Sequence, residues 1–279
     1  MNSIISPQKA IENIIVLCSA PTSNDLDELL LKKIYQDWLM KIQPHCPIIS
    51  DNTEAIVVDK KSTDFTDYFI KEDRVTFDQI ITESLMYPDV NVRIQHVKSA
   101  IHTLHENEPI KGSLFDLIIN SVLFDHGISL GGTSVNPNYI GVICIHNDMY
   151  AETAAIPELL LHELAHNMLF LDELRYQHYK DYALLKLKAN MIDSPYLDKT
   201  IKLPLDRVLH RMVVFIEILE YRNKHIGHMT RRSQHSSTDI IVQTTKKYIH
   251  DIESLNLHNK LLTTRGYEIY KKCCNYFYN

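Results

Sequence analysis

The residues best suited to chemistry form the sequence His162-Glu163-Leu164-Ala165-His166, an HExxH motif. The motif lies in an apolar pattern of helical period that runs from about residue 153 to beyond residue 171. Side chains four residues apart stand one above the other on a helix, so both imidazoles project from one face and can bind the same metal ion. Glu163 is turned by about 100° from His162 and would flank the ion, either as a catalytic base or as a group that supports a ligand. The motif therefore predicts a metal site with His162 and His166 as ligands.

Two histidines do not complete a metal site, and two residues of a later helix are candidates for the third ligand. That helix is predicted to open at Pro204 and to run to about residue 224. His210 would give a three-histidine site, whereas Glu217 would give the two-histidine, one-carboxylate zinc site of a gluzincin-type peptidase. The two residues are seven apart, so they share a face but are separated by about 10 Å of helical rise. Only one of them can bind the ion.

Four segments between residues 129 and 222 carry a family resemblance. They are the Gly-Gly-Thr-Ser loop at 131–134, the HExxH motif, Ser-Pro-Tyr at 194–196 and Val-Leu-His at 208–210. In this order they resemble the HExxH-type peptide-modifying enzymes of ribosomal peptide (RiPP) biosynthesis, which are 2-oxoglutarate-dependent iron β-hydroxylases. The resemblance implies that His162, His166 and His210 bind Fe(II). It also implies hydroxylation at Cβ of a residue in a peptide or of an amino acid, with 2-oxoglutarate and O₂ as co-substrates.

The residue that binds 2-oxoglutarate is less clearly matched. The family carries an Arg-Pro pair several residues before the helical histidine, and the corresponding stretch here reads Lys-Leu-Pro-Leu-Asp-Arg at 202–207. The distal carboxylate of 2-oxoglutarate favours a fork-shaped donor. Arg207, one turn before His210, is the first candidate, and Arg211 or Arg222 the next.

Two other functions are compatible with the same residues. A zinc metallopeptidase would use Glu163 as general base and Glu217 as third ligand, and a strand predicted at 139–145 would align an extended substrate by main-chain pairing. A catalytically silent relative would bind a peptide and retain the HExxH motif as a remnant.

Composition limits the partners of the protein. The 279 residues contain 29 Lys and Arg against 35 Asp and Glu, a net charge of −6, which disfavours nucleic acid and anionic membranes. No apolar run approaches the roughly 20 residues of a membrane-spanning helix. The five cysteines are odd in number and include only an adjacent close pair, as expected of a reduced, cytoplasmic protein without a disulfide framework.

The predicted fold is α+β and predominantly helical, with a zincin-like HExxH helix packed beside a small β-sheet. A single domain, 1–279, is expected, comprising an N-terminal helical scaffold (1–125), a metal-site region (129–225) and C-terminal helices (237–278). A His-rich stretch that contains His225, His228, Arg231, Arg232 and His235 is predicted to be a solvated loop. The remaining predicted elements are helices at 25–40, 91–104, 114–124, 238–255 and 257–278, a strand at 55–58 and a loop at 191–203.

Overall fold

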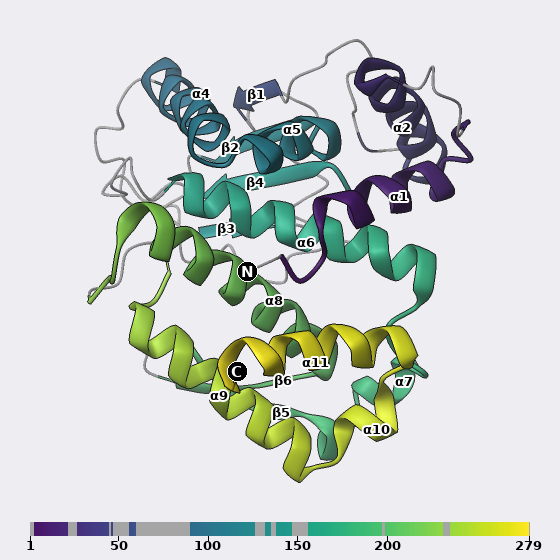
Figure 1. Cartoon of the computed structure of the whole chain (residues 1–279), viewed down its shortest axis with the longest axis vertical. Helices are drawn as coiled ribbons and strands as arrows, with labels where there is room; N and C mark the ends of the chain where they lie inside the picture. The colour runs from purple at the N-terminus through teal and green to yellow at the C-terminus, as the bar shows by residue number, and fades with distance from the viewer. Residues whose placement is uncertain are drawn as a thin grey trace, which may run out of the picture. The chain divides into compact units, whose positions relative to one another are not determined.

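The chain is α+β and predominantly helical, as the sequence predicts. The computed structural model (Figure 1) describes residues 3–21, 27–44, 46, 56–59, 90–125, 132–134, 138–146, 156–196, 199–230 and 235–278. Contacts divide the chain into two compact units. The first unit comprises residues 1–13, 168–232 and 236–279, and the second comprises residues 14–167 and 233–235. Among the described residues, no helix combines the length and the apolar character that a bilayer crossing requires.

The second unit is built on a four-stranded mixed sheet of order β1-β2-β4-β3. The first two pairings are parallel, and β3 runs antiparallel to β4. The strands are β1 (Ile56–Asp59), β2 (Ser121–Asp125), β3 (Gly132–Ser134) and β4 (Val142–His146). Parallel strands need a long crossover connection. Helices α4 (Val90–Asn107) and α5 (Pro109–Ile118) lie in the connection from β1 to β2, and they appear above β2 and β4 in Figure 1.

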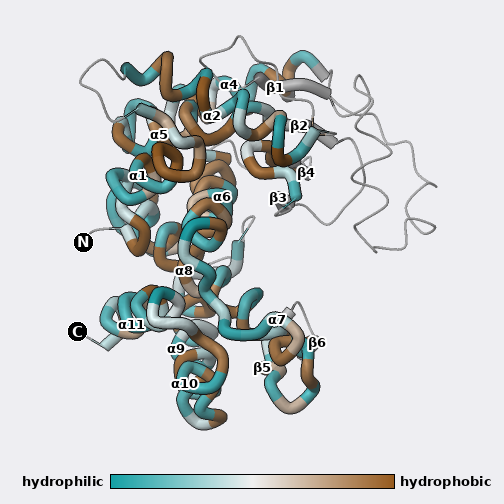
Figure 2. The backbone as a smooth tube through the Cα atoms, turned by 90° about the vertical axis from the view of Figure 1, so that its right-hand side faces the viewer, coloured by the Kyte–Doolittle hydropathy of each residue, from teal (hydrophilic) through white to brown (hydrophobic). Residues whose placement is uncertain are grey.

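Buried apolar side chains fill the space between the sheet and its helices. Val122, Val142 and Ile143 on the central strands are fully buried, which is typical of parallel strands covered on both faces. Helix α5 is brown over much of its length in Figure 2 and buries Phe115 and Ile118. The second unit therefore has its own hydrophobic core.

Helix α2 (Glu28–Ile42) closes this core against the C-terminal end of α5. Asp27 caps α2 by accepting a hydrogen bond from the backbone N–H of Leu30. The buried Lys32 ammonium donates to the backbone carbonyls of residues 116, 117 and 119, which lie at or just beyond the last turn of α5. Carbonyls at this end of a helix have no intrahelical partner, so Lys32 satisfies groups that would otherwise be buried without a donor.

The first unit is a helical assembly with one hairpin. Helix α8 packs against α9 and α11 and buries most of its residues. A π-helical turn, Arg222–Ile226, continues α8. The elements of this unit after α6 are α7 (Tyr182–Leu185), the 3₁₀ turn Lys188–Asn190, β5 (Ile192–Tyr196), β6 (Lys199–Leu203), α8 (Leu205–Tyr221), α9 (Thr238–Ser254), α10 (Leu257–Leu261) and α11 (Thr264–Tyr278). Helices α1 (Pro7–Leu17) and α6 (Ile156–Tyr176) contribute residues to both units.

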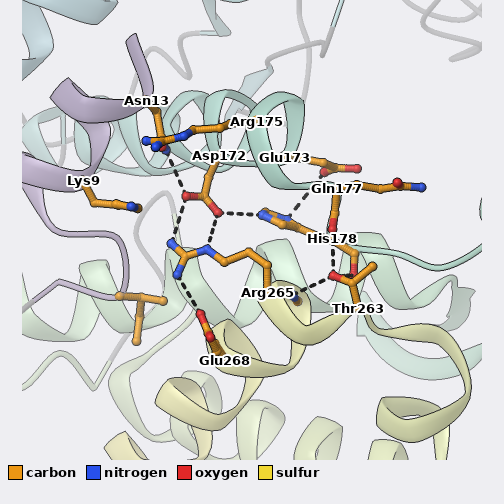
Figure 3. Close-up of polar contacts among 12 residues, drawn as sticks. Lys9, Asn13, Asp172, Glu173, Arg175, Gln177, His178, Thr263, Arg265 and Glu268 are labelled. Carbon is orange, nitrogen blue, oxygen red and sulfur yellow. Dashed lines mark hydrogen bonds and ion pairs between the residues drawn. The ribbon is translucent and has the colours of Figure 1, made fainter. Parts of the chain in front are cut away.

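A buried polar network joins three helices of the first unit (Figure 3). Asp172 on α6 is fully buried and accepts two hydrogen bonds from Arg265 on α11, at 2.8 Å from Nε and 2.9 Å from Nη2. It also accepts from Asn13 Nδ2 on α1 at 2.9 Å and contacts His178 Nε2 at 2.8 Å. Burial by itself raises the pKa of Asp172, but the hydrogen bonds from His178, Arg265 and Asn13 outweigh it, so the pKa lies well below its ordinary value. Asp172 is thus a structural anchor of the first unit.

Most predicted elements are present with shifted ends, but four predictions are wrong. The Gly-Gly-Thr-Ser segment at 131–134 is predicted to be a loop, but residues 132–134 form β3 because they pair with β4. The helix predicted at 114–124 ends at Ile118, and residues 121–125 form β2. An apolar run this short does not show whether it is helix or strand by its periodicity, and pairing with β1 and β4 makes it a strand. The loop predicted at 191–203 is the β5–β6 hairpin. The single helix predicted at 257–278 is two helices, since α10 ends at Leu261 and α11 begins at Thr264.

Candidate functional site at the HExxH helix

Helix α6 (Ile156–Tyr176) carries the whole HExxH motif, as the apolar periodicity predicts. Pro157 lies in its first turn, where the missing N–H costs no intrahelical bond. Glu158 in the first turn and Arg175 in the last turn both complement the helix dipole. The predicted start near residue 153 falls outside the described residues.

The two motif histidines lie on one face of α6, as their spacing predicts. The ring centroids of His162 and His166 are 4.9 Å apart and the ring planes are inclined by 52°. The carboxylate of Glu163 is almost completely buried, and its Oε1 lies 3.9 Å from His162 Nε2. Two imidazoles can supply two of the three or four protein ligands that a metal site needs, and a carboxylate beside them can act as a base.

A third histidine contacts the motif from a distant part of the chain. His235 Nε2 lies 2.7 Å from His162 Nδ1, and the two rings are nearly parallel, with an interplanar angle of 18°. His235 Nδ1 lies 2.6 Å from Oε1 of Glu158, whose residue is 1% exposed. All three residues belong to the second unit.

The location of His235 corrects one prediction. Its side chain is only 9% exposed, so His235 does not belong to a solvated loop. His225 and His228 are exposed, as predicted, whereas Arg231 and Arg232 lie outside the described residues. The sequence offers a weak signal for Glu158, which precedes His162 by four residues on one helix face. It offers none for His235, which is 73 residues from His162 and follows no recognisable spacing.

The described residues do not form a complete ligand set. Within the part of the chain that the structure describes, no group of three or more His, Cys, Asp or Glu side chains is arranged to hold a metal ion. His162 and His166 fit two positions of such a site. The third ligand therefore stays a prediction.

His210 lies on α8 and contacts two side chains of α6 within the first unit. Its Nε2 is 3.7 Å from Oε2 of Glu173, and its ring centroid is 5.1 Å from that of Phe170. Burial raises the pKa of Glu173, but the interactions with His210 and with the Tyr182 hydroxyl outweigh this effect and lower it. His210 is thus a buried histidine that faces an ionised carboxylate.

The alternative third ligand, Glu217, lies two turns further along α8. Its side chain is buried and accepts a hydrogen bond from the Ser3 hydroxyl at 3.5 Å. It also raises the pKa of Cys273 on α11, although burial is the largest cause of that shift. The described contacts of Glu217 thus include Ser3, near the start of the chain.

The three candidate arginines for 2-oxoglutarate differ in their surroundings. Arg207 is exposed, whereas Arg211 is half-buried on α8. Arg211 Nη1 donates to Ser194 Oγ at 2.7 Å and to the Tyr248 hydroxyl at 3.4 Å, and these two hydroxyls contact each other. The fold thus brings Arg211, a candidate for binding 2-oxoglutarate, to the Ser-Pro-Tyr segment of the family resemblance. Arg222, the other arginine considered, is buried and donates to the backbone carbonyl of Ser236.

The strand predicted to align a substrate is not available for that purpose. Residues 142–146 form β4, which lies between β2 and β3 and has both edges paired. β3 is an edge strand of the described sheet, so one of its edges is unpaired among the described strands. The described part of β3 has three residues, Gly132–Ser134, that could pair with an added chain.

Comparison of the chain with protein-family models gives no match, and comparison with curated proteins gives none either. Fold and site together define a predominantly helical α+β protein that carries an HExxH motif on a long helix.

Proposed function

We propose that this protein is a metal-dependent enzyme, and specifically a non-haem Fe(II) and 2-oxoglutarate-dependent hydroxylase of RiPP type that acts on Cβ of a residue in a peptide or of an amino acid. The observation that carries the proposal is the pair His162 and His166, whose rings lie 4.9 Å apart on one helix face beside the buried Glu163. The order of the family segments along the sequence favours this chemistry over others that use the same motif. His210 is the proposed third ligand.

The described residues suggest a role for each part of the site. His162 and His166 would hold the ion through ring nitrogens, and neutral imidazoles leave other coordination positions open. Iron held there would supply, with 2-oxoglutarate and O₂, the oxidising power for C–H hydroxylation, and succinate and CO₂ would be the co-products. Arg211 is a better partner than Arg207 for the distal carboxylate of 2-oxoglutarate, because Ser194 and Tyr248 hold its guanidinium in place.

A zincin-like arrangement around α6 is part of the proposal. Helix α6 follows β4 in the chain, and the side chain of Asn167 accepts a hydrogen bond from the Gly141 N–H just ahead of that strand, at 2.8 Å. Asn167 also donates to the Glu163 carbonyl at 2.9 Å, so the motif helix is tied to the entrance of β4. In Figure 1 this part of α6 runs beside β4 and β3.

A zinc metallopeptidase is the second candidate function. It is favoured by the burial of Glu163 beside His162, which suits a general base. It is also favoured by the edge of β3 that is unpaired among the described strands, where an extended peptide could add. In this alternative Glu217 would be the third ligand. A catalytically silent protein that binds a peptide would instead retain stoichiometric metal without turnover.

Visible absorption spectroscopy tests the proposal directly. We expect the anaerobic Fe(II)-loaded protein to develop a metal-to-ligand charge-transfer band when 2-oxoglutarate is added. Absence of the band, together with zinc retained from expression, would refute the hydroxylase and direct attention to peptide hydrolysis.

Variants on α8 separate the two enzyme classes. In the hydroxylase, His210→Ala should abolish the charge-transfer band and weaken metal binding, while Glu217→Ala should leave both unchanged. The peptidase predicts the reverse for metal binding. His228→Ala removes an exposed histidine and is the matched control for general loss of imidazole.

A further inference from the structure

A chain of hydrogen bonds leads from a buried carboxylate to the first histidine of the motif. Its members are Glu158, His235 and His162, with contacts of 2.6 Å and 2.7 Å between ring nitrogens and their partners. Glu158 is buried and the side chain of His235 is 9% exposed, so their contact is not a solvent-exposed surface pair. Hydrogen bonds in such surroundings fix the side chains that make them.

The positions of the protons follow from the acceptor at the end of the chain. Glu158 lies in the first turn of α6, where the helix dipole favours a negative carboxylate, and an ionised carboxylate can only accept. His235 must therefore carry a proton on Nδ1. With His235 neutral, its Nε2 carries no proton, so His235 Nε2 accepts and His162 Nδ1 donates. His162 is then in the tautomer that has its lone pair on Nε2.

We propose that His235 and Glu158 are positioning residues of the HExxH centre, which hold His162 as the Nδ1–H tautomer and direct its Nε2 lone pair to the metal. The inference rests on the proposed function insofar as it concerns metal binding. Histidine ligands commonly donate their second ring N–H to an outer partner that sets the tautomer and orients the ring. Here the partner is a second histidine, which is in turn oriented by a carboxylate.

The distances favour positioning over direct ligation by His235. Nitrogens 2.7 Å apart share a proton, whereas two nitrogens bound to one tetrahedral zinc ion lie about 3.3 Å apart when each metal–nitrogen bond is about 2.0–2.1 Å. His235 Nε2 is also committed to His162 Nδ1, the nitrogen that would be remote from the ion. The structure thus assigns His235 to the outer side of His162.

Nuclear magnetic resonance of the metal-free full chain tests the tautomer. Long-range ¹H–¹⁵N spectra of histidine-labelled protein, assigned with His162→Ala, should show His162 with a protonated Nδ1 and an unprotonated Nε2. His235→Ala should convert this pattern to a mixture of tautomers, and His235→Gln, whose amide oxygen can accept the same proton, should restore it. A wild-type His162 protonated on Nε2 overturns the proposal.

Metal affinity provides the second readout. Competition of Zn(II) or Co(II) against a chromophoric chelator should show affinity reduced about 10–100-fold in His235→Ala and in Glu158→Ala, with partial recovery in His235→Gln. The control His228→Ala should match the wild type. Unchanged affinity and an unchanged tautomer in His235→Ala overturn the inference and leave the proposed function standing. Complete loss of binding in His235→Ala with Glu158→Ala unaffected would make His235 a ligand and also overturn it.

If the wild type binds no metal, the proposed function fails. The His162 tautomer then still decides the inference about the hydrogen-bond chain.

Discussion

Removing the carboxylate of Asp172 should destabilise the protein strongly. Asp172→Ala deletes four hydrogen-bond contacts and leaves Arg265, whose side chain is only 16% exposed, without its buried counter-charge. Breaking a buried pair by removing one partner costs about 3–5 kcal/mol. We expect a loss of free energy of unfolding in that range for Asp172→Ala. Arg265→Ala should cost less, about 2–3 kcal/mol, because Asn13 and His178 remain as partners of the carboxylate.

Urea unfolding followed by far-ultraviolet circular dichroism measures these losses. The double variant should be less destabilised than the sum of the single variants by about 1–3 kcal/mol, since both remove the same interaction. Glu268→Ala removes a half-exposed partner of Arg265 and should change stability by less than about 1 kcal/mol. A loss below about 1 kcal/mol in Asp172→Ala would refute the assignment of Asp172 as an anchor.

The same residue predicts a dependence on pH. The pKa of Asp172 is lower in the folded protein than in the unfolded chain, so its contribution to stability is fully present above the unfolded value of about 4. The contribution is lost as the pH falls through the folded pKa. Below about pH 4, the stability of Asp172→Ala should therefore fall less steeply than that of the wild type, and equal slopes would contradict this explanation.

Three further predictions concern other parts of the chain. Gly141→Ala should cost about 1–3 kcal/mol in urea unfolding, because φ is +83° and the new Cβ would lie 2.6 Å from Asn120 Nδ2; wild-type stability would contradict this. Burial lowers the pKa of Lys32 to about 7, so between about pH 7 and pH 10 the folded protein binds fewer protons than the unfolded chain. The melting temperature should therefore rise with pH over this interval, and Lys32→Met should abolish that rise. Arg211→Met should weaken 2-oxoglutarate binding at least about tenfold by anaerobic titration, with Arg207→Met near the wild type, and the opposite order would exclude Arg211.

Local features of the sequence determined the helices and the geometry of the motif pair. The placement of His162 and His166 on one helix face requires only the helical repeat of 3.6 residues, and apolar periodicity is sufficient to predict α6 and α8. Pro157 and Pro204 mark the starts of those helices, because proline lacks the N–H that the first helical turn leaves unbonded. These predictions involve residues within one or two helical turns of each other.

Tertiary structure decided which distant residues meet. Residues 121–125 become a strand because β1 and β4 flank them, a pairing that their own apolar pattern does not specify. Arg265 is 93 residues from Asp172, and His235 is 73 residues from His162, so no periodicity relates the members of either pair. Their contacts depend on how the helices pack, and buried polar groups then require partners wherever packing places them. Sequence alone therefore determined the HExxH pair, whereas the packed chain determined the groups that hold His162 in place.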